Sequence, residues 1–152
     1  MIVRKARIDD LKSVQELNYK LFDFERNNFD PLLNMEWTFS EKGEEFFKRL
    51  IERGIVWVVV DGDRLIGYLA GDIIDEPFCT TKAFAKLKNI YVDKDYRRRG
   101  IGKELLKEFK AYCTERNIEE IRVTTNSKNT NAREFYESNG FGDFEITYKM
   151  KI

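Results

Sequence analysis

Apolar residues follow two kinds of pattern along the chain: a helical spacing, and short continuous runs that are typical of buried strands. Helical spacing predicts helices over 9–26, 40–54, 101–116 and 131–138. Apolar runs predict strands over 1–7, 55–60, 65–74, 87–92 and 120–125, and the alternation of 143–152 predicts a closing strand. The order β-α-α-β-β-β-α-β-α-β favours an α/β (α+β) fold in which helices cover a mixed sheet.

Capping and turn residues mark several of these boundaries. Asp9 and Ser40 precede predicted helices as N-caps, and Gly54 follows the second helix as its C-terminal stop. The Asp61-Gly62 dipeptide between two apolar runs predicts a β-hairpin. The aromatic segment 27–39 has no periodicity, so it either closes one end of the core or lines a pocket.

The stretch 87–109 predicts a strand that passes through a basic, glycine-containing turn into an amphipathic helix from about Ile101. The first N–H groups of such a helix have no intrahelical partner and carry the positive end of the helix dipole, which suits a phosphate. Gly100 and Gly102 let a ligand approach the main chain closely. Cationic side chains surround this turn: Arg97, Arg98, Arg99 and Lys103.

Two common glycine-rich phosphate motifs do not fit this turn. The dinucleotide motif needs a third glycine where the chain has Leu105, and the Walker motif needs one at Arg97. The pattern that is present, Arg97-x-x-Gly100-x-Gly102, resembles the acetyl-CoA signature of the GNAT superfamily of N-acyltransferases. The resemblance implies that the turn binds the pyrophosphate of CoA and that the sheet is mostly antiparallel. A basic, solvated helix start is the alternative.

A second motif of the same family begins one helix and one strand later. The pattern N-x-x-A-x-x-F-Y-x-x-x-G-F, from Asn129 to Phe141, resembles the family's other signature. By that resemblance, Asn129 contacts the pantetheine arm and the Tyr136 hydroxyl lies near the CoA sulfur. Asn129 can equally be a helix-entry residue. For Phe135 and Phe141 we favour a role in the core.

Amide formation from a thioester needs a neutral amine, stabilisation of an oxyanion and protonation of the departing thiolate. Main-chain N–H groups at the end of the strand, in Ile90, Tyr91 and Val92, can polarise the carbonyl. A tyrosine of pKa about 10 can donate a proton to a thiolate of pKa about 8.5. Tyr136 is therefore the predicted general acid.

The sequence leaves several candidates for the residue that accepts the proton from the amine. The resemblance to N-terminal-amine acetyltransferases places a glutamate where this chain has Thr124, which argues against that subgroup. Glu36 is the tentative base, with Glu25, Asp72 or water as alternatives. The chain contains no histidine, which removes the commonest general base and excludes Ser-His-Asp and Cys-His nucleophilic sites.

Composition narrows the partners. With 27 basic and 27 acidic residues, a general nucleic-acid-binding protein is not expected. Cys79 and Cys113 cannot form a four-cysteine zinc site, and we expect ordinary thiols and no metal. No signal-like segment or long apolar run is present, so we expect one domain over 1–152, in the cytoplasm and without a membrane partner.

The substrate is predicted to be a primary amine that receives an acetyl group directly from acetyl-CoA, without a covalent enzyme intermediate. Acidic residues in the regions that face substrate in this fold favour a small cation such as a polyamine as the acceptor. Ordinary solvated surface charge is the alternative explanation of these residues. They are Asp23, Glu25, Asp30, Glu36, Asp72, Asp75 and Glu76. Other hypotheses are N-terminal or lysine acetylation of a peptide or protein, a non-catalytic CoA-binding sensor, and a structural subunit. A homodimer through the final strand and the aromatic segment is a further option.

Overall fold

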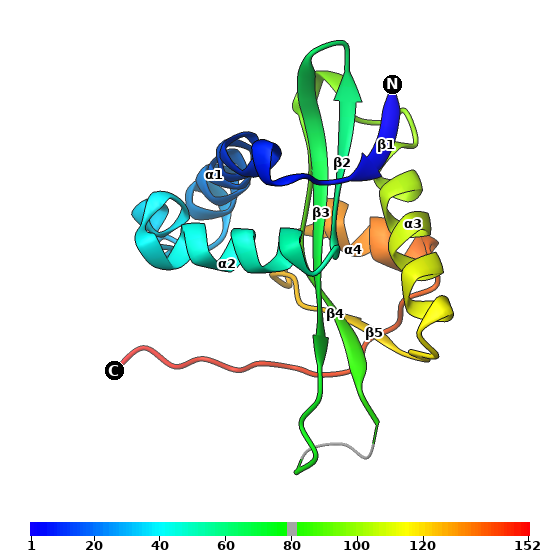
Figure 1. The fold of residues 1–152 in the computed structure, drawn as a ribbon. Helices are drawn as coiled ribbons and strands as arrows, with labels where there is room; N and C mark the ends of the chain where they lie inside the picture. Colours follow the sequence, from blue (N-terminus) through cyan, green and yellow to red (C-terminus); the bar gives the residue numbers. More distant parts are fainter. Residues whose placement is uncertain (79–81) are drawn as a thin grey trace.

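The computed structural model describes residues 1–78 and 82–152, and its centre is a five-stranded sheet (Figure 1). The strands lie side by side in chain order: β1 (Ile2–Lys5), β2 (Val56–Asp61), β3 (Arg64–Ile74), β4 (Phe84–Val92) and β5 (Ile121–Val123). The first three pairings are antiparallel, whereas β4 and β5 run parallel. The expected mixed, mostly antiparallel sheet flanked by helices is confirmed.

Helices cover both faces of this sheet. The helices α1 (Leu11–Asn28) and α2 (Glu41–Glu52) lie on one side, and α3 (Ile101–Glu115) and α4 (Thr130–Ser138) lie on the other (Figure 1). Three short 3-10 helices connect the elements: η1 (Ile8–Asp10), η2 (Met35–Phe39) and η3 (Lys94–Tyr96). Because helices cover both faces, successive residues of β2 and of the middle of β3 are buried on both sides of the sheet.

The core is built from aromatic contacts on each face of the sheet. On the α3 side, the ring of Trp57 lies 5.7 Å from that of Phe109, centroid to centroid. On the opposite side, Phe47 of α2 lies 6.3 Å from Tyr68. Gly71 lets α3 come close to β3, since a Cβ at this position would lie 2.4 Å from the Phe109 ring.

The predicted start of the first helix is wrong in detail, while the second is confirmed. A 3-10 turn precedes α1, and the capping residue is not Asp9; instead, the Asp10 carboxylate accepts the Arg7 N–H over 2.7 Å. The same carboxylate pairs with the Arg4 guanidinium over 2.7 Å. At α2 the Ser40 hydroxyl accepts the Gly43 N–H over 3.1 Å, as an N-cap does.

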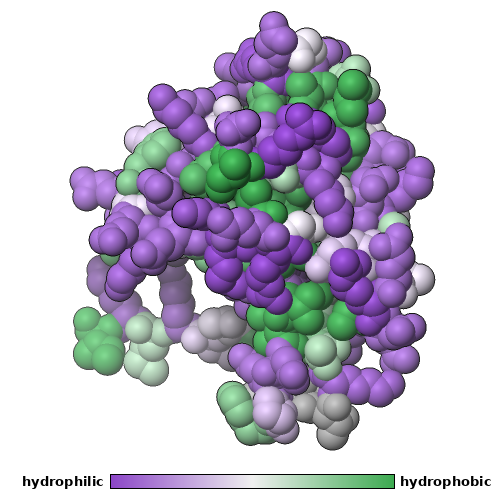
Figure 2. All heavy atoms as spheres, viewed as in Figure 1, coloured by the Kyte–Doolittle hydropathy of each residue, from purple (hydrophilic) through white to green (hydrophobic). Residues whose placement is uncertain are grey.

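The closing strand predicted over 143–152 is not formed. The segment leaves the body of the molecule and runs to the C-terminus at the lower left of Figure 1, where it also stands apart in the space-filling view (Figure 2). Its alternating apolar side chains are at least 69% exposed: Phe144, Ile146, Tyr148, Met150 and Ile152. Alternation fixes which side chains share a face, but a strand also needs a hydrogen-bonding edge beside it.

Candidate active site

The turn after β4 leaves the N-terminus of α3 open. Arg98 and Gly100 have positive φ angles of 61° and 78°, and α3 begins directly after Gly100. No side chain caps this helix, in contrast to α2 with Ser40 and α4 with Asn129. The first N–H groups of α3 are therefore available to a ligand, as a phosphate site requires.

The basic residues of the turn keep their charges available for an anion. The Nε of Arg97 donates to the Val92 carbonyl oxygen over 2.9 Å, and its guanidinium lies 5.4 Å from the Tyr91 ring centroid. Arg99 donates to the Asp95 carbonyl oxygen over 3.0 Å. Within the described residues, no carboxylate forms an ion pair with any basic side chain of the turn: Arg97, Arg98, Arg99 or Lys103.

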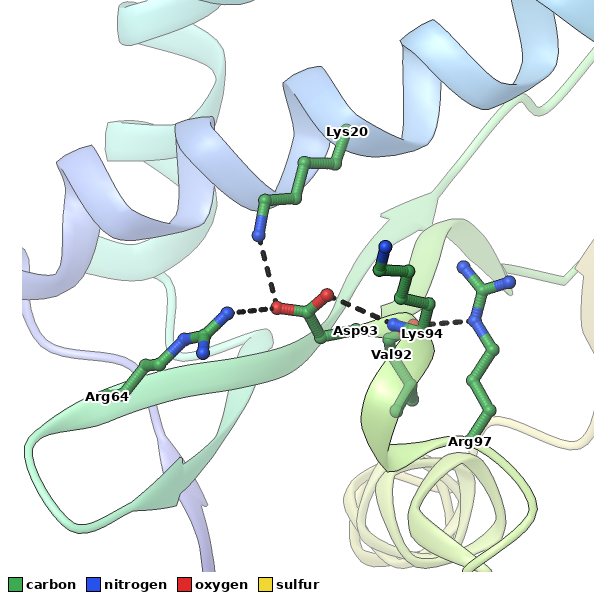
Figure 3. Close-up of polar contacts among 6 residues, drawn as sticks. All are labelled: Lys20, Arg64, Val92, Asp93, Lys94 and Arg97. Atoms are coloured by element: carbon green, nitrogen blue, oxygen red, sulfur yellow. Dashed lines mark hydrogen bonds and ion pairs between the residues drawn. The ribbon is translucent and has the colours of Figure 1, made fainter.

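Asp93 anchors the turn at the point where β4 ends (Figure 3). Its buried carboxylate accepts from Lys20 of α1 over 3.1 Å and from Arg64 of β3 over 2.6 Å. It also accepts the Lys94 N–H over 3.0 Å and so caps η3. Burial acts to raise the pKa of Asp93, but Lys20 and Arg64 outweigh it, so the pKa lies below its usual value. The carboxylate thus ties α1, β3 and the phosphate turn together.

The strands β4 and β5 pair over only three residues and then separate. Their register ends at Leu87 and Val123, so β5 does not pair with β4 at Ile90, Tyr91 or Val92. The main-chain groups expected to polarise a carbonyl therefore lie beside the open part of the sheet. The helix α4, which carries Tyr136, lies on the α3 side of the sheet (Figure 1).

A cavity of about 260 Å³ lies where the strands separate, on the side of α1 and α2. Its lining residues come from three helical segments and from the paired strands: Phe22, Trp37, Phe46, Lys86, Leu87, Lys88, Asn89 and Thr124. Both interpretations of the aromatic segment hold, because Trp37 lines the cavity while Met35 and Thr38 are buried.

A buried hydrogen-bond network holds η2, and with it Trp37, in place. The Asn18 amide donates to the Tyr68 hydroxyl over 2.9 Å, and the Thr38 hydroxyl donates to the Asn18 carbonyl oxygen over 2.7 Å. Gln15 donates to the Thr38 main-chain carbonyl over 2.9 Å. Since buried polar groups are costly when unpaired, this network specifies one position for the aromatic wall of the cavity.

Tyr136 is packed between two aromatic neighbours of its own motif. Its ring lies 5.4 Å from Phe135 and 5.5 Å from Phe141, centroid to centroid. Burial, and secondly the charge of Glu25, raises the pKa of Tyr136, so its hydroxyl keeps its proton well above neutral pH. Asn129 has the predicted helix-entry role, because its side chain accepts the Ala132 N–H over 3.1 Å.

The candidate bases lie in very different surroundings. Glu36 is exposed, and neither Glu36 nor Glu25 is among the described residues that line the cavity. Asp72 is buried but bonded to Arg53 over 2.7 Å and to a second arginine. Glu25 is half-buried, and burial followed by the Asp30 charge raises its pKa. Its charge also raises the pKa of Tyr136, so Glu25 is the candidate that lies near the predicted acid.

Several site residues were not anticipated from the sequence. Asp93 has one weak signal, a charged residue at the end of an apolar strand. Lys86 and Lys88 lie two apart at the start of β4, which suggests a shared face but does not reveal a cavity. Phe22 and Phe46 follow the helical spacing of core residues, and only the packing of α1 beside α2 brings them to the cavity.

The structure addresses the expectations about the cysteines and about membrane segments only for the residues that it describes. Cys113 is buried on α3, and burial raises the pKa of its thiol to about 11, as for an ordinary core thiol. Cys79 lies outside the described residues. Over 1–78 and 82–152, no helix has both the length and the apolar character needed to cross a membrane.

Comparison with known proteins connects this geometry to one fold. In the crystal structure of a mutant protein from Bacillus halodurans, the likeness covers 100% of this chain and 99% of that one, with a TM-score of 0.85 and 19% identity. The PaiA N-acetyltransferase of Thermoplasma acidophilum, solved in complex with coenzyme A, gives a TM-score of 0.81 at 23% identity, over 96% and 92% of the two chains.

Sequence relatives point to the same family. An uncharacterized N-acetyltransferase of Methanocaldococcus jannaschii is 27% identical over 95% of this chain, which spans 62% of that relative's length. Another from Archaeoglobus fulgidus is 26% identical over 91% of this chain and 90% of the relative. The model of the acetyltransferase (GNAT) family matches residues 18–141, which include both motifs and most of the sheet. The chain belongs to the acetyltransferase (GNAT) family.

Proposed function

We propose that residues 1–152 act as a single domain that transfers an acetyl group from acetyl-CoA directly to a primary amine. The observation that carries this proposal is the uncapped N-terminus of α3, placed beside strands that separate and surrounded by basic side chains that form no ion pair within the described residues. The site fits the cosubstrate, because the main chain at Gly100 is open and a phosphate can reach it. Acetyl-CoA, when bound, supplies an acetyl group already activated as a thioester.

Each predicted site residue has a distinct task in this proposal. The first N–H groups of α3, with the basic side chains around them, hold the pyrophosphate. Asn129 and the open edge of β4 hold the pantetheine arm, and main-chain N–H groups near Tyr91 and Val92 stabilise the oxyanion. Tyr136 gives its proton to the departing thiolate. Because burial keeps this hydroxyl protonated, it is ready as a donor at neutral pH.

We assign the proton acceptor to Glu25 in place of Glu36. Glu25 is half-buried and acts electrostatically on Tyr136, whereas Glu36 is exposed. Its raised pKa also makes Glu25 a stronger base than an ordinary carboxylate. Asp72 is excluded from the role because its two oxygens are held by arginines.

The charges of the cavity do not favour the expected polyamine. Among the described residues that line it there are two lysines and no acidic side chain. Asp72, one of the seven acidic residues behind the expectation, is neutralised by its arginine partners. The proposal therefore keeps the acceptor as a primary amine, of a small molecule or of a peptide.

A thiol-release assay with acetyl-CoA and a panel of amines tests the proposal, with calorimetry of CoA binding alongside. The panel contains polyamines, aminoglycosides, amino acids and short peptides. Turnover with any class supports the transferase. CoA binding without turnover would favour a sensor, and absence of CoA binding would overturn the central assignment. Turnover confined to peptides would favour the protein-modifying alternative.

We further propose that the tail 143–152 forms a homodimer by adding as a strand to the open edge of β5 in a second copy. The support is the alternation of exposed apolar side chains in a segment that forms no strand in the described structure, with Phe144 beside Arg122 of β5, the last strand of the described sheet. Sedimentation of the wild type and of an Ile146→Lys, Tyr148→Lys double variant tests this. We expect the wild type to be a dimer and the double variant to be a monomer. A monomeric wild type would contradict the proposed dimer.

A further inference from the structure

The cavity carries positive charge that acetyl transfer alone does not explain. Lys86 and Lys88 both line it and are half-buried. Taking an ammonium group out of water is costly unless another charge or a hydrogen bond compensates it. In the part of the chain that the structure describes, neither lysine forms an ion pair with one.

An irregularity in β4 places Lys88 at this cavity. Ala70 of β3 pairs with Asn89 and the next residue, Gly71, pairs with Leu87, so Lys88 is an extra residue in the strand. Such a bulge re-aims a side chain and is frequent beside functional sites. The bulge lies directly after the last residue of β4 that pairs with β5, which is where the cavity opens.

Cations from two elements meet at one aromatic wall of the cavity. The Lys88 ammonium lies 6.0 Å from the Phe46 ring centroid, and the Arg49 guanidinium lies 5.8 Å from the same centroid. Burial, and then the charge of Lys86, lowers the pKa of Lys88. Asp72 is the carboxylate that acts against these positive charges. It is already paired with Arg49 and with a second arginine, so it does not neutralise Lys88 as well.

We propose that the acceptor is a primary amine that also carries an anion, a carboxylate or a phosphate, on an apolar body that lies against Trp37 and Phe46. Lys86 and Lys88 bind the anion, and the two aromatic rings contact the body. The part that concerns the amine rests on the proposed acetyl transfer, whereas the part that concerns the anion rests on the cavity alone. A polyamine, with several positive charges, is repelled from the same cavity.

A binding measurement, which does not depend on turnover, tests whether the cavity binds an anion. Calorimetry measures the affinity of the protein, with and without CoA, for N-acetylphenylalanine and for N-acetylphenethylamine, which differ by one carboxylate. We expect the carboxylate to bind at least about tenfold more tightly, because charge-assisted bonds are stronger than neutral ones. The preference should fall with added salt. Equal affinities, or absence of binding by the carboxylate, would overturn the inference.

Matched variants locate the effect. Lys88→Gln and Lys86→Gln should each reduce the preference, whereas Lys42→Gln, the same charge change at an exposed position of α2, should leave it unchanged. A preference that survives both lysine variants would contradict the assignment. Phenylalanine against phenethylamine, and tyramine phosphate against tyramine, distinguish a carboxylate from a phosphate by kcat/KM. Selective anion binding without turnover overturns only the transferase, and turnover without anion preference overturns only this inference.

Discussion

Gly102 of α3 and Phe135 of α4 lie in contact, so that the two sequence motifs of this chain meet through one pair of residues. A Cβ built on Gly102 would lie 3.2 Å from Cε2 and 3.3 Å from Cζ of the Phe135 ring. The ring of Phe135 in turn packs 5.4 Å from that of Tyr136. The glycine of the phosphate turn therefore sets how close α4, with its tyrosine, can come to α3.

Gly102→Leu should weaken CoA binding at least tenfold, or about 1.4 kcal/mol. The new side chain crowds the first turn of α3 and pushes Phe135 away. Calorimetry with CoA measures the effect. Gly142→Leu is the matched control, since nothing lies within 4 Å of a Cβ there, and it should bind CoA normally. Unchanged affinity in Gly102→Leu would remove the phosphate assignment.

Tyr136→Phe should lower kcat by about 10²- to 10⁴-fold, the usual contribution of a general acid. The ring contacts with Phe135 and Phe141 are kept, so CoA affinity should not change. Steady-state kinetics and calorimetry on the same preparation separate the two quantities. A variant as fast as the wild type would show that the thiolate leaves without help from this hydroxyl.

Glu25→Gln should remove a similar factor of about 10²- to 10⁴-fold from kcat and yet stabilise the fold at neutral pH. Burial raises the pKa of Glu25 in the folded state, so its contribution to stability is complete below the unfolded pKa and is lost as pH rises through the folded value. Glutamine does not ionise, so the variant does not lose this stability as the pH rises. Thermal unfolding at pH 4 and pH 7 should show the variant gaining relative to the wild type only at the higher pH. Loss of both activity and stability would mark a structural role instead.

Asp93→Asn should destabilise the protein by about 1–2 kcal/mol, because Lys20 and Arg64 lose their shared charged partner. The pKa of Asp93 is lowered in the fold, so this stability is present above the unfolded pKa and disappears as pH falls through the folded one. Urea unfolding at pH 7 measures it. Glu119→Gln, which breaks an exposed pair with Lys82, should have a much smaller effect, because exposed ion pairs contribute little to stability. Equal effects of the two variants would contradict the anchoring role.

Local signals allowed much of the nucleotide side of the site to be predicted from the sequence. The turn from Val92 to Gly102 depends on glycine conformations and an uncapped helix start, and both can be recognised in a short stretch of residues. Ser40 and Asn129 were predictable for the same reason, because a cap acts within one turn. These features are confirmed because no distant contact competes with them.

The acceptor side depends on contacts between distant segments and was not predictable in the same way. The hydrogen bond from Asn18 to Tyr68 joins α1 to β3, and the bond from Thr38 to Asn18 ties the aromatic segment 27–39 to both. The bulge at Lys88 follows from the pairing of β4 with β3, which periodicity does not reveal. The strand predicted over 143–152 was wrong for a related reason. Alternation predicts a strand but does not say with which sheet edge that strand pairs.

The early separation of β4 from β5 has a consequence for hydrogen exchange. Amide groups of β4 beyond Leu87 that point toward β5 have no partner strand, so this part of β4 is an open edge of the described sheet. We expect them to exchange with deuterium as fast as loop amides in the free protein, while their neighbours that pair with β3 are protected. Addition of CoA should slow their exchange and leave that of β2 unchanged. In the proposed function, the pantetheine arm lies along this open edge of β4, in the position that a further strand would occupy.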